Sequence, residues 1–410
     1  MLRKRAKPIA CWLIALFAIA IILLHFESDL LWKVQRYNLF LYSQLFFKQQ
    51  MTVSGGMLSY LGAFFTQFLY HPWLGVTMLC GWWLLLMWLV MRTFSVPDRC
   101  SIVALIPVAI LLTANMDMGY WVYAIKLHGW FFSATIGTTV GVAMLWAFRK
   151  LPSHLWLRMG FVVFVSVAGY PLMGVYALAT ALLMGIWTWR LTNNRQQNII
   201  LSATALLTIV VIPLYYYRFV YCQTNIIDIY RTAIPDFTFQ EEHPSYYIPY
   251  YLLVFYFLAF AIAYRKQQPI VAKEQEMPVA RQDVKNKKST KYSSFLLYWV
   301  GQSLLIIAVG AIVWHFWYRD ANFHHELRMQ RCIEECDWEN VMKEGRDQHE
   351  EPTRSIVMMH NLALSRLGRQ CEEMYNFPKG SSRSNTSLPV YLFNTVGRLI
   401  YYNYGMMNDC

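Results

Sequence analysis

Long apolar runs alternate with short polar connections along residues 8–317, and this pattern predicts a bundle of membrane-spanning helices. About 20 mostly apolar residues cross a bilayer as an α-helix. Nine segments approach that length, and the third and fifth are the shortest. They are residues 8–24, 73–91, 100–114, 130–148, 155–169, 172–189, 198–217, 247–264 and 295–317. The sequence therefore predicts an all-α fold, with a polytopic transmembrane helix bundle of about nine spans in residues 1–317.

Lysine and arginine are unevenly distributed among the connections. If the N-terminus is cytoplasmic, the inner connections carry 19 of these residues and the outer connections carry 6. Because cytoplasmic loops are enriched in both residues, this asymmetry predicts an N-in, C-out topology. The longest inner connection, 265–294, is rich in Lys and Gln without apolar periodicity. We expect it to be a disordered cytoplasmic linker.

Composition supports a membrane location and argues against a nucleic-acid partner. The chain is 57% hydrophobic and only 15% charged, whereas soluble domains are about 25% charged. The net charge of +12 comes mainly from residues in the connections, where they set topology. None of the eight cysteines forms a C-x-x-C pair, so no disulfide framework is implied. The lipid bilayer is the expected partner.

Residues 25–72 follow the first span but cannot themselves cross a membrane. Apolar and basic positions alternate in residues 29–50, which predicts an amphipathic helix lying in the interface with its basic face toward headgroups. The pair Gly55 and Gly56 predicts a break. Residues 57–70 then form a second short interfacial helix, with Ser59, Ala63, Thr66 and Tyr70 on its more polar side.

After residue 317 the composition changes, with 11 basic and 13 acidic residues over 318–410. Apolar positions at helical spacing in 337–369 predict two antiparallel helices that resemble a tetratricopeptide hairpin. A further helix at 388–402 would start the next repeat. Such hairpins need a polar cap, and since none follows, we expect a truncated periplasmic helical-repeat domain that could bind a periplasmic protein partner.

The first outer connection carries the candidate chemistry. Glu27 and Asp29 come directly after the first span, and Lys33 and Arg36 follow. A carboxylate there can act as a general base, or hold a divalent metal against a donor phosphate. The basic residues can neutralise a lipid phosphate. The alternative is that these acids are solvated loop charges.

Two further sets of polar residues have weaker support. Asp117 is a second outer acid, with Lys126 in the same connection, and we place them as additional catalytic and phosphate-binding candidates beside a purely interfacial role. His324 and His325 precede two cysteines at spacings that suit zinc. No second Cys/His pair completes a tetrahedral site, so positions on a repeat helix are favoured.

The layout resembles the GT-C class of membrane glycosyltransferases. The shared features are a cytoplasmic N-terminus, acids and interfacial helices in the first outer loop, and an extracytoplasmic C-terminal domain. The sequence lacks the Asp-Asp, Asp-Glu or Asp-x-Asp pair of that class and has fewer spans. The resemblance implies transfer of a sugar from a polyprenyl-phosphate donor during envelope glycan assembly.

A second resemblance covers nearly the whole chain. Its motifs are GGMLSYLGAFFTQFLYHPWLG, GYWVYAIKLHGWFFSATIG, NLALSRLGR and LFNTVGRLIYYNYG. Together they resemble an uncharacterised family of polytopic inner-membrane proteins of Bacteroides-type bacteria, a domain of unknown function. That implies a Gram-negative inner membrane and a periplasmic tail. The expected function is either a GT-C-like transferase or a non-enzymatic scaffold; a proton-coupled transporter is disfavoured because the spans contain almost no ionisable residues.

Overall fold

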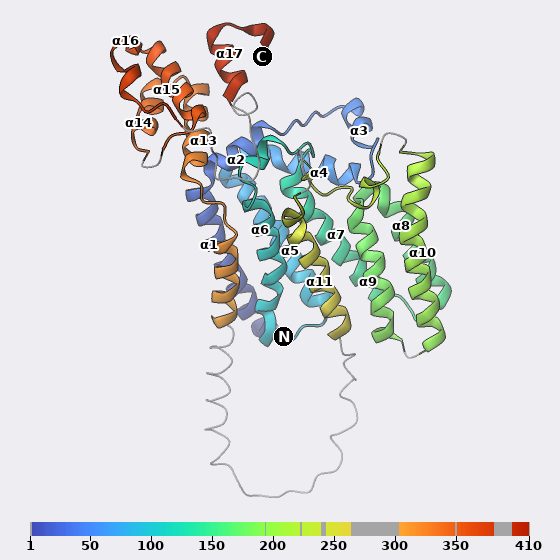
Figure 1. Cartoon of the computed structure of the whole chain (residues 1–410). Helices are drawn as coiled ribbons and strands as arrows, with labels where there is room; N and C mark the ends of the chain where they lie inside the picture. Colours follow the sequence, from blue (N-terminus) through green and yellow to red (C-terminus); the bar gives the residue numbers. More distant parts are fainter. Residues whose placement is uncertain are drawn as a thin grey trace, which may run out of the picture.

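The structure, a computed structural model, describes residues 2–192, 194–221, 224–238, 243–263, 303–348, 351–380 and 396–409. Within these ranges the regular secondary structure is helical, which confirms the all-α prediction for them. The predicted linker 265–294 lies outside the described residues. Figure 1 shows an upright helix bundle, with the start of α1 at one end and the tail helices at the other.

Six described helices are long and apolar enough to cross a membrane. Three shorter apolar helices coincide with the remaining predicted spans, so crossing by all nine stays a prediction. The six lie in α1 (Leu2–Phe26), α5 (Pro72–Thr93), α7 (Trp130–Lys150), α8 (Leu155–Met173), α10 (Arg195–Phe219) and, with η5 (Pro244–Tyr247), α11 (Ile248–Ala263). The shorter ones are η2 (Asp98–Leu105) with α6 (Ile106–Met116), α9 (Val175–Leu191) and Ser303–His315.

The fifth predicted span is longer than its apolar pattern indicates. Helix α8 continues to Met173, through Pro171, and the chain breaks at Gly174 with φ +58°. A proline lacks the N–H that would pair with the carbonyl four residues earlier. Here that carbonyl, on Val167, accepts a hydrogen bond from the Tyr216 hydroxyl at 3.0 Å. The neighbouring helix α10 therefore allows α8 to pass through its proline.

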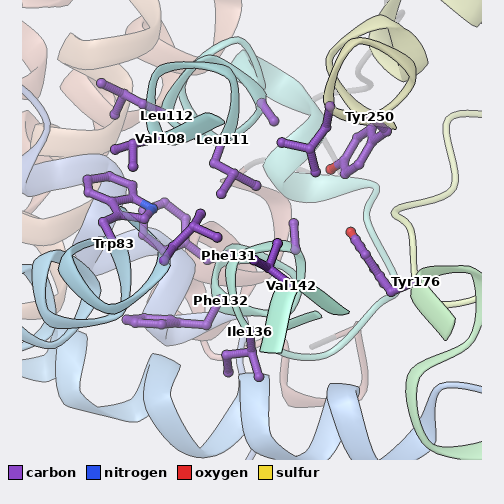
Figure 2. Packing of buried hydrophobic residues seen from close by; sticks show 14 of the residues in the cluster. Trp83, Val108, Leu111, Leu112, Phe131, Phe132, Ile136, Val142, Tyr176 and Tyr250 are labelled. Carbon is purple, nitrogen blue, oxygen red and sulfur yellow. The ribbon is translucent and has the colours of Figure 1, made fainter. Parts of the chain in front are cut away.

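The bundle core is built from large side chains on α5, α6 and α7. Trp83, Leu111 and Phe131 are almost fully buried and lie together in Figure 2. Fully burying such a side chain contributes about 1.5–3 kcal/mol. The same apolar cluster continues into α13 (Ala321–Glu334) through Phe323 and Leu327. One core thus joins the membrane helices to the first helix of the tail.

The first outer connection forms several short helices instead of one long amphipathic helix over 29–50. They are α2 (Ser28–Arg36), α3 (Gln44–Gln50), α4 (Gly56–Thr66) and η1 (Gln67–Tyr70). Between α2 and α3, the Asn38 amide donates to the carbonyl of Ala63 at 2.9 Å and its oxygen accepts from the Gly129 N–H at 3.2 Å. These two hydrogen bonds attach the segment between α2 and α3 to the bundle, where the single predicted helix is interrupted.

Helix α4 packs against α7 through the face that the sequence marks as more polar. Ser59, Ala63 and Thr66 are buried. The hydroxyls of Ser59 and Thr66 tolerate burial because each donates a hydrogen bond to the carbonyl four residues earlier. The contact is close: a Cβ at Gly129, where φ is +67°, would lie 2.0 Å from the Ala63 nitrogen. Only glycine accommodates this approach. The expected polar outer face of this helix is therefore wrong for these three residues.

The tail contains the predicted helix pair, α14 (Trp338–Arg346) and α15 (Arg354–Arg366). Val341 and Met342 face Ile356 and Met359 in a second apolar cluster, as the spacing predicts. Helix α13 packs on both, forming a three-helix unit. The elements α16 (Gln370–Glu373), η6 (Met374–Asn376), α17 (Arg398–Tyr404) and η8 (Met407–Asp409) follow. A tetratricopeptide repeat stays a prediction, and residues 381–395 of the expected next repeat lie outside the described residues. The remaining short elements are η3 (Gly119–Tyr123) and η4 (Asp228–Tyr230).

Candidate functional site

Polar residues predicted as catalytic or phosphate-binding join α2 to α13. The Asp29 carboxylate lies 3.0 Å from Arg328 Nε and 3.9 Å from Arg331 Nη1. Two turns further along α2, Arg36 pairs with Glu334 at 2.6 Å. Because Arg36 and both tail arginines are 41–49% exposed, each pair contributes little stability alone, about 0–1 kcal/mol. Together they fix the register of the tail on the bundle.

Lys33 lies inside this contact and is only 6% exposed. Its ammonium donates to Gln330 Oε1 at 2.5 Å, and it lies 4.8 Å and 5.2 Å from the ring centroids of Tyr37 and Tyr123. Burial lowers the Lys33 pKa to about 8. Lys33 therefore faces α13, so the expectation that it lies on a face toward lipid headgroups is wrong.

Glu27 occupies a different position, at the end of a large cavity. It is 3% exposed, and its Oε1 accepts a hydrogen bond from Trp317 Nε1 at 2.6 Å. Burial is the main cause that raises its pKa to about 7, and the negative charge of Asp29 adds to the rise. A carboxyl group with this pKa exchanges a proton readily near neutral pH.

The cavity has a volume of about 600 Å³ and lies between three apolar helices. Most of its lining is aliphatic or aromatic, while polar groups gather at the end beneath α13. The walls come from α1, from η2 with α6, and from the helix Ser303–His315; the polar end is formed by Glu27, Arg319, His324, His325 and Arg328. Among the described lining residues, Glu27 is the only acid.

The charged groups at the polar end are held in place by their neighbours. Arg328 lies between Asp29 and Glu344, at 3.0 and 3.6 Å. The Arg319 guanidinium lies 4.6 Å from the centroid of the Trp314 ring. Burial, then the nearby Arg328 charge, lowers the His324 pKa, so this imidazole is neutral at pH 7. The resulting site has two permanent cations and one carboxyl group that can titrate.

Of the six residues predicted from the sequence, Glu27 alone lines this cavity. Asp29 forms an ion pair with Arg328 outside the cavity lining. Lys33 and Arg36 contact α13. Asp117 is half-buried at the end of α6, and desolvation raises its pKa to about 6. Lys126 is exposed. The structure therefore does not bring Asp117 or Lys126 to the Glu27 cavity.

The residues that the sequence did not assign to this site lie in the tail, although His324 was considered there as a zinc ligand. Arg319, His324 and Arg328 reach the cavity because the chain enters α13 directly after the last apolar helix. The available signal was a series of basic and imidazole groups within about three helical turns of the predicted span that ends at residue 317. No group of three or more His, Cys, Asp or Glu side chains that could hold a metal occurs in the part of the chain that the structure describes.

These features define an all-α membrane protein with a cavity between apolar helices, covered at one end by a helical tail. The chain belongs to the Family of unknown function (DUF6057), whose model matches residues 4–410. Neither a curated protein nor a solved structure matches it.

Proposed function

We propose that this protein binds a polyprenyl-phosphate lipid in the cavity between α1, α6 and Ser303–His315, and transfers the attached sugar with Glu27 as general base. One observation carries the proposal: a long apolar cavity ends in a titrating carboxyl group and two arginines. The volume of about 600 Å³ is within the 300–1,000 Å³ that ligand pockets usually have.

The apolar walls favour a lipid chain as the ligand. Ala18 and Ile22 of α1 face the cavity from one side, and Val309 and Val313 of Ser303–His315 line it from another. These helices are apolar enough to lie in hydrocarbon. A prenyl chain that moves from the bilayer into this cavity leaves one apolar environment for another, so its apolar contacts give little discrimination between lipids. Specificity must therefore come from the polar end.

The polar end favours a phosphate. Arg319 and Arg328 carry their charge at any physiological pH, and guanidinium groups bind phosphate oxygens through paired hydrogen bonds. Asp29 and Glu344 restrain Arg328 without lining the cavity themselves. A phosphate placed here would therefore meet one cation, Arg328, that is already restrained before binding, and a second, Arg319, that is exposed beside the Trp314 ring.

Glu27 supports the transfer step. In the proposed reaction an acceptor hydroxyl gives its proton to Glu27, and its oxygen forms a bond to the anomeric carbon of the sugar. The bond from that carbon to the phosphate oxygen breaks, and the electron pair stays on the phosphate beside Arg319 and Arg328. The hydrogen bond from Trp317 fixes the carboxyl group in one orientation. The described residues supply no metal cluster, so we derive no step through a metal.

In this proposal the cavity mouth faces the outer leaflet of a bacterial inner membrane, with the tail in the periplasm. The basic residues of the connections support that orientation. The competing function is a scaffold, in which the tail binds an envelope protein and no reaction occurs. The experiments below would favour the scaffold if substitutions at Glu27 and in the cavity have no effect.

Binding is tested by native mass spectrometry of the full chain with a 55-carbon polyprenyl phosphate. Ala18→Phe fills the cavity and should reduce the bound fraction at least tenfold, and Arg319→Gln should weaken binding about fivefold through the lost charge contact. Ala203→Phe is the matched control, because Ala203 is exposed on α10 and does not line this cavity. Equal binding by wild type and Ala18→Phe would refute the proposed site.

Catalysis is tested separately in a deletion strain by comparing envelope glycans and lipid-linked intermediates. Complementation with Glu27→Gln should leave the intermediates accumulated. Asp29→Asn should clear most of the intermediates and largely restore the envelope glycans, because Asp29 acts through Arg328. Full rescue by Glu27→Gln would remove the catalytic assignment and leave the lipid-binding assignment standing on the mass spectrometry.

A further inference from the structure

A second, smaller cavity lies on the other side of the bundle, between α7, α9 and α11. Its volume is about 140 Å³, and residues of the segment 224–238 lie at one end. Figure 2 shows Tyr176 of α9 and Tyr250 of α11 with their hydroxyl ends turned toward each other. None of its described lining residues lines the larger cavity, so the two are distinct.

Glycines on α7 determine how α9 approaches. A Cβ at Gly137 would lie 2.8 Å from the ring of Tyr176, and one at Gly141 would lie 2.7 Å from Thr180 Oγ1. The Tyr176 ring therefore packs directly on the α7 backbone. Its hydroxyl extends beyond the helix toward α11, at the side of the cavity (Figure 2).

Two buried hydroxyl groups of this cavity have no hydrogen-bond partner among the described residues. They are Tyr176 Oη and Thr138 Oγ1, on side chains that are only 8% and 5% exposed. Buried polar groups are almost always paired, because leaving one unpaired is costly. Their position on the wall of an apolar cavity indicates that a ligand supplies the missing partners.

The shape of the cavity indicates a chain. Tyr230 and Tyr251 lie at its polar end, and Leu145, Leu183 and Phe257 line the opposite, apolar part. Thr138 and Leu145 are two turns apart on α7, which corresponds to about 10 Å. Among the described lining residues the one charged group is Arg231, which neighbours Tyr230 and whose guanidinium lies 5.2 Å from the centroid of the Tyr247 ring. The unpaired groups themselves are neutral hydroxyls, and these favour a neutral oxygen as their partner.

We propose that this cavity binds a neutral single-chain amphiphile, with its hydroxyl or carbonyl oxygen at Tyr176 and Thr138 and its alkyl chain beside Leu145 and Phe257. The site is independent of the proposed transferase. It takes a neutral ligand, whereas the larger cavity is assigned to a phosphate-bearing lipid. A cavity of roughly 150 Å³ is large enough to hold a benzene-sized apolar group. Only a short segment of the ligand's alkyl chain therefore lies inside the cavity, and the rest of the chain extends out of it.

The experiment uses the full chain in nanodiscs and a fatty alcohol of 16 carbons that carries a photoreactive diazirine in its chain. Crosslinked peptides identified by mass spectrometry should include those containing Leu183 or Phe257. Ala179→Phe fills the cavity from α9 and should reduce this labelling at least fivefold. Tyr176→Phe keeps the ring and removes one hydrogen-bonding group, so it should reduce labelling about fivefold. Ala18→Phe, in the other cavity, should leave the labelling unchanged.

Competition distinguishes the ligand class. Unlabelled hexadecanol should displace the probe, and hexadecyl phosphate at the same concentration should not. Labelling that persists in Ala179→Phe would overturn the site, and equal displacement by hexadecyl phosphate would overturn the assignment to a neutral ligand. Because Tyr176→Phe is nearly isosteric, it keeps the proposal testable even if Ala179→Phe does not fold.

Discussion

Glu326 on α13 provides the most quantitative prediction about how the tail is held on the membrane helices. It is 1% exposed, and one of its oxygens accepts a hydrogen bond from the Thr353 hydroxyl. Burial raises its pKa from an ordinary 4.5 to about 7. Between those two values the folded protein keeps a proton that the unfolded chain has released. Stability therefore falls as pH rises through this window.

The size of the effect follows from the pKa. At about 1.4 kcal/mol per pH unit, a rise from 4.5 to about 7 corresponds to roughly 3 kcal/mol, taken as an upper value. Glu326→Gln keeps an acceptor for Thr353 and cannot ionise. We expect it to match wild type at pH 5 and to be more stable by up to about 3 kcal/mol at pH 8. Glu27 has a raised pKa in the same window, so part of the pH dependence should remain until Glu27→Gln is added.

The assay is thermal unfolding in maltoside micelles at pH 5, 6, 7 and 8, followed by tryptophan fluorescence. A shift of roughly 2–4 °C per kcal/mol applies to chains of 150–250 residues and a smaller one to longer chains, so we expect Tm to rise by a few degrees at pH 8. Glu335→Gln is the matched control. Glu335 directly follows the last residue of α13, and its side chain is 59% exposed. A Glu326→Gln variant that is less stable than wild type at pH 8, or equally pH-dependent, would refute this reasoning.

Three further substitutions test individual contacts. Asp29→Asn should loosen α13 by about 0.5–1 kcal/mol and speed proteolysis of the tail at low salt, because its partner Arg328 is 43% exposed; an unchanged cleavage rate would contradict this. Gly129→Ala should cost several kcal/mol, since its Cβ would meet the Ala63 nitrogen at a positive φ, and a wild-type yield of monodisperse protein in gel filtration would show otherwise. Tyr176→Phe should leave Tm in delipidated detergent unchanged or slightly higher because its hydroxyl has no described partner, and a clear fall in Tm would count against an unpaired group.

The apolar helices could be located from the sequence because a bilayer imposes one length and one composition on anything that crosses it. Their ends were less predictable. The end of α8 depends on Tyr216, which satisfies the carbonyl that Pro171 leaves free, and this contact joins residues 49 positions apart. Local pattern cannot reveal such a contact.

The charges of α2 show why the site was only partly predictable. Asp29, Lys33 and Arg36 look like a solvated or headgroup-binding face when read alone. The α13 partner of Lys33 is 297 residues away in the sequence, and that of Asp29 is 299 residues away. A matching order of opposite charges exists in the two helices, but many other pairings of charged helices fit the sequence equally well. Glu27 was predictable because its position depends only on where the first span ends.

The most direct test of the central claim is an experimental structure of the full chain in nanodiscs that contain a 55-carbon polyprenyl phosphate. We expect an elongated density between α1, α6 and Ser303–His315, with its phosphate within hydrogen-bond distance of Arg319 or Arg328 and beside Glu27. An empty cavity at saturating lipid, or a density whose headgroup lies away from Glu27 and both arginines, would contradict the account.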